Sequence, residues 1–443
     1  MMSDLPRKLG LADALAIVVG MIIGGGIFVV PNLVARSMGS GVSILALWMF
    51  AGLLSFCGAL ACAELGTAIP ATGGQYVFLR EAFGPLAGFL YGWSVFLVGR
   101  TAQISWLAVT LSLYVSYFVP VGPVESKLIG ASAILVLATV NYCGVRAGAL
   151  VQKSFALAKV AGLLVIIASG LLLGGHAAQV QTTPAPFSFA QTGVALIACL
   201  LAYDSWISVS FVAGEIKNPQ RNVLLALLIG LAICITIYTL ANGAYLHVLS
   251  IPEIAASDHV GASAAERVLG PVGGKLVSAI ILLSMIGTLN GAFLTSPRIY
   301  FAQARDGLFF RRFGEVHPRF RTPAFAIAAQ AVWAVVLLLS GTYETLADYA
   351  MFSLWVFYGL MILGLMVLRR RRPDLPRPYR MWGYPVTPLV FLAVAAWFLI
   401  NTLVTRPGPA LAGLAFIASG VPVYFVWRSR AAKTSAIAQP AGS

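Results

Sequence analysis

The sequence predicts an all-α membrane protein of twelve spans, arranged as two inverted five-helix repeats followed by two further helices. The first observation is compositional: 59% of the 443 residues are hydrophobic, 10% are charged, and the mean hydropathy is +0.89. A soluble domain would carry about 25% charged residues. The second is that apolar runs of about 18 residues or more recur, each long enough to cross a bilayer. The third is that helix-disfavouring residues interrupt both the first and the sixth span.

The spans are expected in twelve apolar segments. They run over about 11–35, 43–69, 86–118, 127–145, 152–174, 191–214, 223–249, 270–302, 324–341, 346–368, 386–404 and 409–427. The chain is thus one transmembrane domain over 1–443, with a first repeat over about 8–175, a second over about 190–370 and two added helices over about 386–427. We expect 250–269 to be the largest external loop, and the small polar residues 431–443 to be a disordered tail.

The basic residues predict the orientation in the membrane. The net charge is +14, but the lysines and arginines gather in alternate short loops. These loops contain Arg7, Lys8, Arg80, Arg146, Lys153, Lys217, Arg221 and the segments 305–321, 369–380 and 428–433. The segments 171–190 and 341–350 contain none. Positive loops stay in the cytoplasm, so we expect a multi-pass protein of the inner (plasma) membrane with both termini cytoplasmic, and no nucleic-acid partner. The arginines 369–372 are interpreted as a topology anchor near anionic headgroups.

No pattern in the chain indicates an enzyme, a channel, a cofactor or a metal site. It contains no HExxH, GxSxG, Walker A or paired-carboxylate motif and no selectivity-filter motif. The cysteines lie in apolar stretches without metal-ligand spacing, as expected of small packing residues; they are Cys57, Cys62, Cys143, Cys199 and Cys234. Since none has an obvious external position for a disulfide link to a second subunit, we expect no heavy subunit.

The most informative interruption is Gly24-Gly25-Gly26, in the middle of the first span. Each glycine costs about 1 kcal/mol against alanine in a helix interior, so three in a row favour unwinding. Unwound backbone at membrane depth is tolerated only where protein or a water-filled cavity satisfies it. The sixth span is interrupted at 201–206, with Asp204 in mid-membrane, about 180 residues later. Two broken helices in corresponding positions predict an inverted repeat and a transporter's substrate site.

A broken helix suits a zwitterion, because its two half-helices present opposite partial charges. Free N–H groups at one end attract a carboxylate, and carbonyls at the other attract an ammonium. An α-amino acid carries both groups on one carbon, and the bare glycine backbone allows it to approach closely. The alternative is that Gly24, Gly25 and Gly26 serve close helix packing.

Two deep ionisable residues are further candidates. Lys159 lies well inside the fifth span, where an ammonium is costly unless it is paired. It is expected to hold carbonyls freed by the glycine break as a tethered cation; the alternative is a lysine that snorkels to the inner interface. Asp204 either attracts a cationic side chain, or caps the broken helix while its carbonyl binds the α-amine. Glu64 and Arg100 are expected near span ends or in structural pairs, and Glu215 in a cytoplasmic network with Lys217 and Arg221.

Several motifs together resemble those of the amino acid–polyamine–organocation (APC) superfamily, and most closely its L-type amino acid transporter (LAT) branch with its bacterial members. They are the segments 9–11, 19–28, 63–66, 70–76, 203–206, 214–222, 287–291 and 369–379. Each is weak alone, but their order and spacing are specific. The resemblance covers about 8–400 and implies the five-plus-five inverted repeat of the bacterial leucine transporter.

The resemblance also implies where the substrate binds and that transport does not depend on sodium. The carboxylate should meet the N–H groups of Gly25 and Gly26, and the α-amine the carbonyls of Ile22, Leu201 and Asp204. The full set of expected substrate-binding residues is Ile22, Ile23, Gly24, Gly25, Gly26, Leu201, Ala202, Tyr203, Asp204, Trp206 and Asn290. Lys159 matches a lysine that stands where sodium sits in sodium-coupled relatives, so it is the expected coupling residue and transport should be sodium-independent.

The chain departs from the family pattern at three places. Gly25 stands where serine is frequent, Leu201 where a gating phenylalanine is frequent, and Ala292 where a hydroxyl partner of the lysine is frequent. Thr295 or Ser296 could replace that hydroxyl. The expected function is exchange of small neutral L-amino acids by alternating access. The alternatives are proton-coupled symport, which requires Lys159 to release its proton, a carrier that accepts cationic amino acids through Asp204, and an amino acid sensor without turnover.

Overall fold

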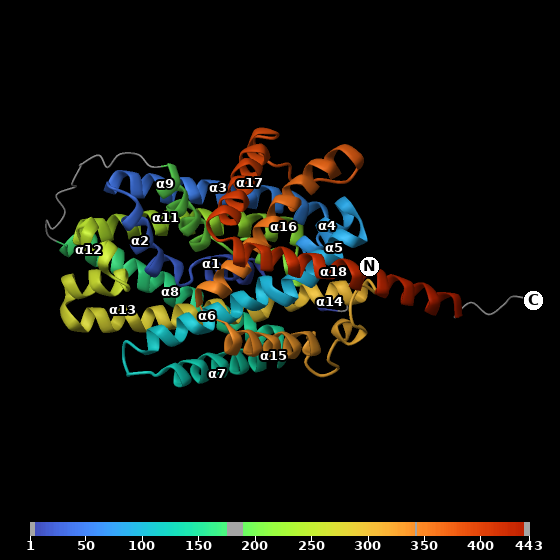
Figure 1. The fold of residues 1–443 in the computed structure, drawn as a ribbon, viewed down its shortest axis with the longest axis horizontal. Helices are drawn as coiled ribbons and strands as arrows, with labels where there is room; N and C mark the ends of the chain where they lie inside the picture. The colour runs from blue at the N-terminus through green and yellow to red at the C-terminus, as the bar shows by residue number, and fades with distance from the viewer. Residues whose placement is uncertain (1–4, 175–188, 342, 438–443) are drawn as a thin grey trace, which may run out of the picture.

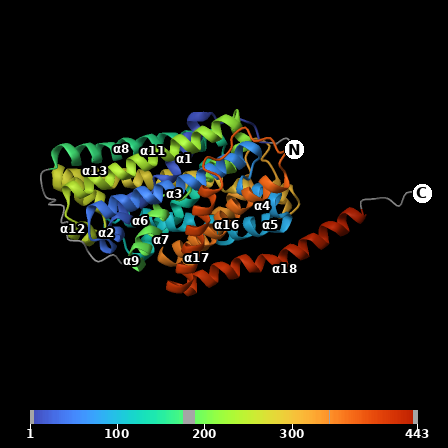
Figure 2. The same cartoon turned by 90° about the horizontal axis from the view of Figure 1, so that it is seen from above.

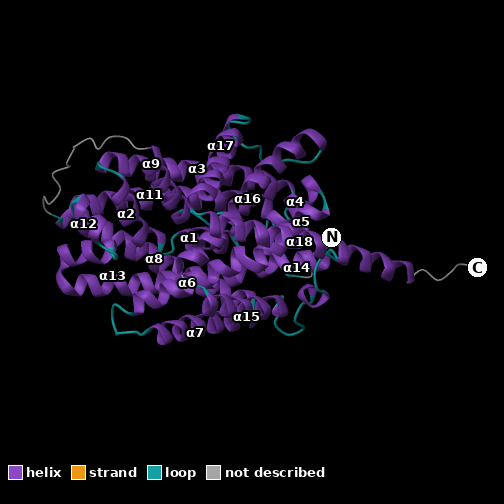
Figure 3. Cartoon of the chain, viewed as in Figure 1, coloured by secondary structure: helices purple, strands orange, loops and turns teal. Residues whose placement is uncertain are grey.

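The computed structural model describes residues 5–174, 189–341 and 343–437, and within them the chain is built of helices (Figures 1 and 3). In order they are α1 Leu11–Ile22, α2 Gly26–Ser37, α3 Gly41–Ala68, α4 Gln75–Phe83, α5 Pro85–Ser94, η1 Val95–Gly99, α6 Arg100–Val115, α7 Pro123–Tyr142, α8 Val145–Leu173, α9 Phe189–Ala202, α10 Ser208–Phe211, η2 Ala213–Glu215, α11 Pro219–Val248, α12 Ile251–Ala256, α13 Val260–Thr295, α14 Pro297–Arg305, η3 Arg311–Gly314, α15 Ala324–Ser340, α16 Tyr343–Arg371, α17 Val386–Thr405 and α18 Pro407–Ile437. The extended pairing in this part of the chain is one isolated bridge, between Leu9 and Ile216.

In the described part of the chain, ten helices or helix runs are long and apolar enough to cross a membrane, so the chain is a multi-pass membrane protein. They are Leu11–Ser37, Gly41–Ala68, Pro85–Val115, Pro123–Tyr142, Val145–Leu173, Pro219–Val248, Val260–Arg305, Met351–Arg371, Val386–Thr405 and Pro407–Arg428. Each overlaps one predicted span. At the other two predicted spans, 191–214 and 324–341, lie the shorter apolar helices Gln191–Ala202 and Ala324–Ser340.

The first helix lies in the middle of the bundle, which places the glycine segment among other helices. α1 packs against α8, α11 and α13, while α2 packs against α9 and α12 (Figure 1). α8 runs along α13, and α3 runs along α11. In Figure 2, α18 leaves the bundle toward the C-terminus, after packing on α5 and α16. Accordingly, 83% of the most apolar stretch of Leu11–Ser37 is buried, against 22% of the most apolar stretch of Pro407–Arg428.

The predicted external loop at 250–269 is wrong, because most of it is helical. α12 begins with a capping box in which Ser250 accepts a hydrogen bond from the amide of Glu253, and the Glu253 carboxylate accepts one from the amide of Ser250. α13 then starts at Val260 and is kinked at Gly270, whose φ is 69°. The proline that follows Gly270 removes a helical hydrogen bond there. The predicted eighth span therefore starts at this kink and not at the beginning of a separate helix.

Two further features differ from what the sequence predicts: a turn inside the third span and the end of the last helix. The third span carries a π-helical turn, η1, immediately before Arg100, and such turns are frequent at functional sites. α18 continues to Ile437, past the expected start of the tail at 431, while the last expected tail residues, 438–443, lie outside the described residues.

Candidate functional site

The glycine segment separates two helices. α1 ends at Ile22, α2 begins at Gly26, and the amide of Gly24 turns back to donate to the carbonyl of Ile22 at 2.7 Å. The carbonyl of Gly25 accepts from the third and fourth amides of the second helix. The amides of Gly26 and Ile27, at the very start of α2, have no carbonyl within their own helix to bond. The segment therefore presents carbonyls on its α1 side and amides on its α2 side.

The three glycines have different reasons to lack a side chain. A Cβ at Gly26 would lie 2.7 Å from both Cα and Cβ of Ala202, so α2 meets the end of α9 backbone to backbone. A Cβ at Gly25 would clash with Cε of Met285. A Cβ at Gly24 would lie 3.3 Å from the hydroxyl oxygen of Thr288. Close helix packing, the alternative explanation for the glycines, thus accounts for Gly26 in particular. The close approach of a ligand remains an expectation for the segment.

Lys159 is fully buried, and its ammonium binds the carbonyl end of α1. Its Nζ donates to the carbonyl of Gly20 at 2.8 Å, that of Ile23 at 2.7 Å and that of Ser284 at 3.0 Å. The carbonyl end of a helix carries partial negative charge, so a cation stabilises it. The side chain therefore takes the tethered-cation geometry and does not reach for the inner interface.

The hydroxyl partner of Lys159 is Thr288, which sequence reasoning missed. Thr288 Oγ1 lies 3.1 Å from the lysine Nζ. The expectation that Thr295 or Ser296 takes this role is wrong, because each bonds the carbonyl four residues before it on its own helix. Thr288 lies one helical turn before Ala292, so the register between α8 and α13 decides which hydroxyl meets the lysine.

The turn that follows α9, where the sequence predicts the break in the sixth span, lies close to the glycine segment. α9 ends at Ala202, and residues 203–207 form a turn in which Ser205 has a φ of 77°. The Tyr238 hydroxyl, from α11, lies 2.7 Å from the carbonyl of Ile22 and 3.2 Å from that of Ala202. One side chain thus bridges the ends of α1 and α9. Tyr203, fully buried, packs on Tyr238 with the rings tilted and their centroids 4.9 Å apart.

The Asp204 carboxylate is held by side chains from two other helices. One oxygen accepts from the Tyr358 hydroxyl at 2.7 Å, and the other from Gln103 Nε2 at 2.9 Å and Ser205 Oγ at 3.0 Å. Arg100 completes the group with a guanidinium nitrogen 3.4 Å away, and both charged side chains are almost fully buried. Arg100 is paired, as expected, but deep in the bundle and against a predicted site residue.

Of two other predicted site residues, one packs against this group and one lies elsewhere. Trp206 packs on the Tyr358 ring at a centroid distance of 5.2 Å. Asn290 instead faces α7 and α8: it donates to the carbonyl of Gly148 at 3.0 Å and accepts from Asn141 at 2.8 Å. Its amide is engaged between scaffold helices.

The described residues include further ion pairs beyond those at the two interruptions. Glu215 pairs with Arg298 at 2.8 Å, both fully buried, so the expected network with Lys217 and Arg221 is wrong. Their sequence proximity is misleading because α14 brings Arg298 across the bundle. Glu64 pairs with Arg369 and, at 3.4 Å, with Arg377.

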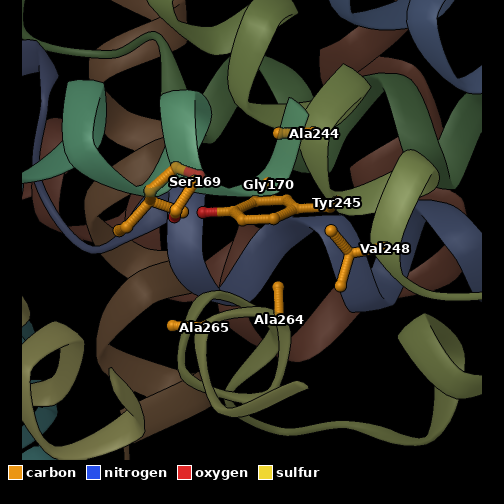
Figure 4. A pocket seen from close by; sticks show the side chains of 8 residues that line it. Ser169, Gly170, Ala244, Tyr245, Val248, Ala264 and Ala265 are labelled. Carbon is orange, nitrogen blue, oxygen red and sulfur yellow. The ribbon is translucent and has the colours of Figure 1, made fainter. Parts of the chain in front are cut away.

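A small crevice lies between α8, α11 and α13 (Figure 4). Its polar lining includes the hydroxyls of Ser169 and Tyr245, and the remainder is apolar or backbone. Tyr245 is seven residues, about two turns, along α11 from Tyr238.

Comparison with known proteins identifies the family. Residues 9–426 match the family model described as amino acid permease. The chain belongs to the amino acid permease family. This permease is 34% identical over 435 residues to the serine/threonine exchanger SteT of Bacillus subtilis, covering 97% of this chain and 99% of that one. It is 34% identical over 438 residues to the human b(0,+)-type amino acid transporter 1, covering 96% and 88% of the two chains. It is 34% identical over 433 residues to the human large neutral amino acids transporter small subunit 2, covering 95% and 80%. The predicted family is therefore confirmed.

Proposed function

We propose that this permease is a sodium-independent exchanger of small neutral L-amino acids, located in the plasma membrane with both termini in the cytoplasm. The observation that carries the proposal is the Lys159 ammonium on the carbonyls of Gly20, Ile23 and Ser284. Carbonyl oxygens grouped around one point are the ligands of a hard cation. A covalently attached cation already fills that position, so the break needs no sodium ion to order it.

The substrate would bind at the glycine segment. Its carboxylate would take the amides at the start of α2, where helix geometry leaves N–H groups without intrahelical partners. Its α-amine would take carbonyls at the ends of α1 and α9, which Tyr238 holds together through Ile22 and Ala202. Both charged groups of the zwitterion would then bind to backbone atoms, and the substrate side chain would contact the surrounding helices.

The architecture proposed for transport is the twelve-span inverted repeat, with helices α1–α2 and α9–α10 as the broken first and sixth spans. Rocking of these helices against the α8 and α13 scaffold would open the site to either side in turn. The Bacillus relative named as a serine/threonine exchanger, similar over nearly its whole length, supports exchange of small amino acids. We propose that the chain works without a heavy subunit.

Proton-coupled symport is the mechanistic rival, because it requires the Lys159 ammonium at the α1 carbonyls to release a proton during the cycle. Uptake of labelled alanine into proteoliposomes in sodium-free buffer separates the two. Exchange predicts uptake only when unlabelled amino acid is inside. Uptake into empty vesicles driven by a pH gradient would replace exchange with symport, and a requirement for sodium would refute the role given to Lys159.

A further inference from the structure

The carboxylate best placed to attract a positively charged substrate already has a cation of its own. Asp204 is 6% exposed, and Arg100, 1% exposed, places its guanidinium 3.4 Å from the carboxylate. The same guanidinium bonds Gln103 Oε1 at 2.7 Å and the Tyr358 hydroxyl at 3.0 Å, and it lies over the Phe211 ring. It is therefore fixed from several sides.

This pair lies within reach of the glycine segment. Ala202, whose backbone touches Gly26, is two residues before Asp204. α6 passes both places, since Thr110 lies near the Cβ position of Gly25 while Gln103 bonds Asp204. Seven residues of helix separate these two α6 positions, or about 10 Å. A substrate side chain that extends from the glycine segment along α6 would therefore approach the Arg100–Asp204 pair.

The stability of the folded protein is a weak reason to keep a buried ion pair of this kind. A buried ion pair can be replaced by apolar side chains at little or no cost in stability, because removing two charges from water offsets their attraction. Here Nε of Arg100 is also buried without a hydrogen-bond partner in the described part of the chain. A fixed guanidinium does have a clear consequence for ligands: a second cation brought beside it in a buried site is repelled.

We propose that Arg100 sets the charge selectivity of the site: its guanidinium occupies the cation position beside Asp204, so neutral amino acids are accepted and lysine or arginine is rejected. The proposal rests on the proposed function and names the residue that decides its substrate class. Asp204 in this arrangement is the partner of Arg100 and not a receptor for substrate cations.

The test is counterflow of labelled alanine and labelled arginine in proteoliposomes, for the wild type and for Arg100→Gln. The wild type is expected to exchange alanine and to ignore arginine. Arg100→Gln leaves Asp204 with its neutral donors and exposes its charge to the substrate, so inhibition of alanine exchange by arginine should strengthen about tenfold or more. The double variant Arg100→Gln/Asp204→Asn should lose this gain.

A matched control changes arginine to glutamine in another ion pair. Arg267→Gln breaks the exposed pair with Glu253 and should leave the arginine response at the wild-type level. Size-exclusion profiles show which variants fold. If Arg100→Gln does not fold, Asp204→Asn serves instead: it leaves Arg100 as an uncompensated cation and should strengthen inhibition by aspartate while arginine stays inactive.

Outcomes separate the two levels of the proposal. Arginine exchanged by the wild type as well as alanine, or a folded Arg100→Gln variant without any arginine gain, overturns the role of Arg100 and leaves exchange intact. Absence of alanine flux in the wild type overturns the proposed function. Ligand-induced thermal stabilisation of the purified protein then tests charge selectivity without flux: stabilisation by alanine and not by arginine supports the role of Arg100, and any other pattern overturns it.

Discussion

Replacing Lys159 with methionine tests the tethered cation most directly. The variant keeps an unbranched apolar stem but removes the ammonium that donates to three carbonyls and one hydroxyl. A hydrogen bond from a charged donor contributes about 1.5–3 kcal/mol, and a buried acceptor left without a partner costs about 1–3 kcal/mol.

Two compensations reduce the expected effect. The Ser284 hydroxyl also donates to the carbonyl of Ile23 at 3.1 Å, so that acceptor is not abandoned. Thr288 likewise reaches the carbonyl of Gly20 at 3.2 Å. Methionine also avoids the cost of burying an ammonium. We therefore expect a net loss of about 1.5–3 kcal/mol in the ordering of the break. Since about 1.4 kcal/mol is a factor of ten, alanine exchange at low substrate should fall tenfold or more.

The assay is alanine counterflow over a range of substrate concentrations, together with thermal unfolding of the purified variant. Lys153→Met is the matched control, because Lys153 lies on the same helix but is half exposed and pairs with Asp13 at 2.9 Å. It should exchange alanine at close to the wild-type rate. Wild-type exchange and an unchanged unfolding temperature in Lys159→Met would refute the reasoning.

Three other perturbations test the site and its surroundings. Gly26→Ala places a methyl group 2.7 Å from the backbone of Ala202, an overpacking of about 1–3 kcal/mol, so counterflow should fall about tenfold; normal counterflow would contradict the close approach. Tyr238→Phe removes the hydroxyl that joins the two interruptions, at about 1 kcal/mol per hydrogen bond, and should raise the alanine concentration for half-maximal exchange several-fold; an unchanged value would place the substrate elsewhere. At the α12 cap, the amide of Ser250 is the main reason that the pKa of Glu253 falls from 4.5 to about 2, with Arg267 adding to it. A lowered pKa stabilises the folded state above about pH 4.5 and loses this effect as the pH falls toward about 2. The wild type should therefore unfold at a higher temperature than Glu253→Gln near neutral pH, with the difference shrinking on acidification; a constant difference would exclude the ionic contribution.

The main chemical positions could be recognised in the sequence because each violates a rule of the bilayer. Three glycines in a span favour unwinding, and an ammonium or a carboxylate at membrane depth requires a partner. These rules indicated Gly24–Gly26, Lys159 and Asp204 without any knowledge of contacts. Gln103 is an amide in an apolar span and gave a weaker form of the same signal. The phenolic hydroxyls of Tyr238 and Tyr358 gave none, since tyrosine is ordinary in membrane helices.

The partners of these residues could not be predicted, because they depend on the rotation and register of packed helices. Moving along α13 by one turn exchanges Thr288 for Ala292 opposite Lys159. Asn290, two residues from Thr288, points to different neighbours, because successive residues of a helix face different directions. Glu215 met an arginine from α14 and not the basic residues beside it in sequence.

The sequence by itself determined that the chain is a multi-pass helical protein of the permease family, with a backbone break and buried charges in its spans. Composition and spacing suffice for the spans, the break and the buried charges, because the lipid solvent penalises each polar group individually wherever it lies. The family was indicated by the motifs that resemble it. Only the tertiary structure decided which charges neutralise one another: Lys159 with the end of α1, and Arg100 with Asp204. Such pairing is a property of distances between helices, and residues as far apart in the chain as 100 and 204 become partners only when packing brings them together.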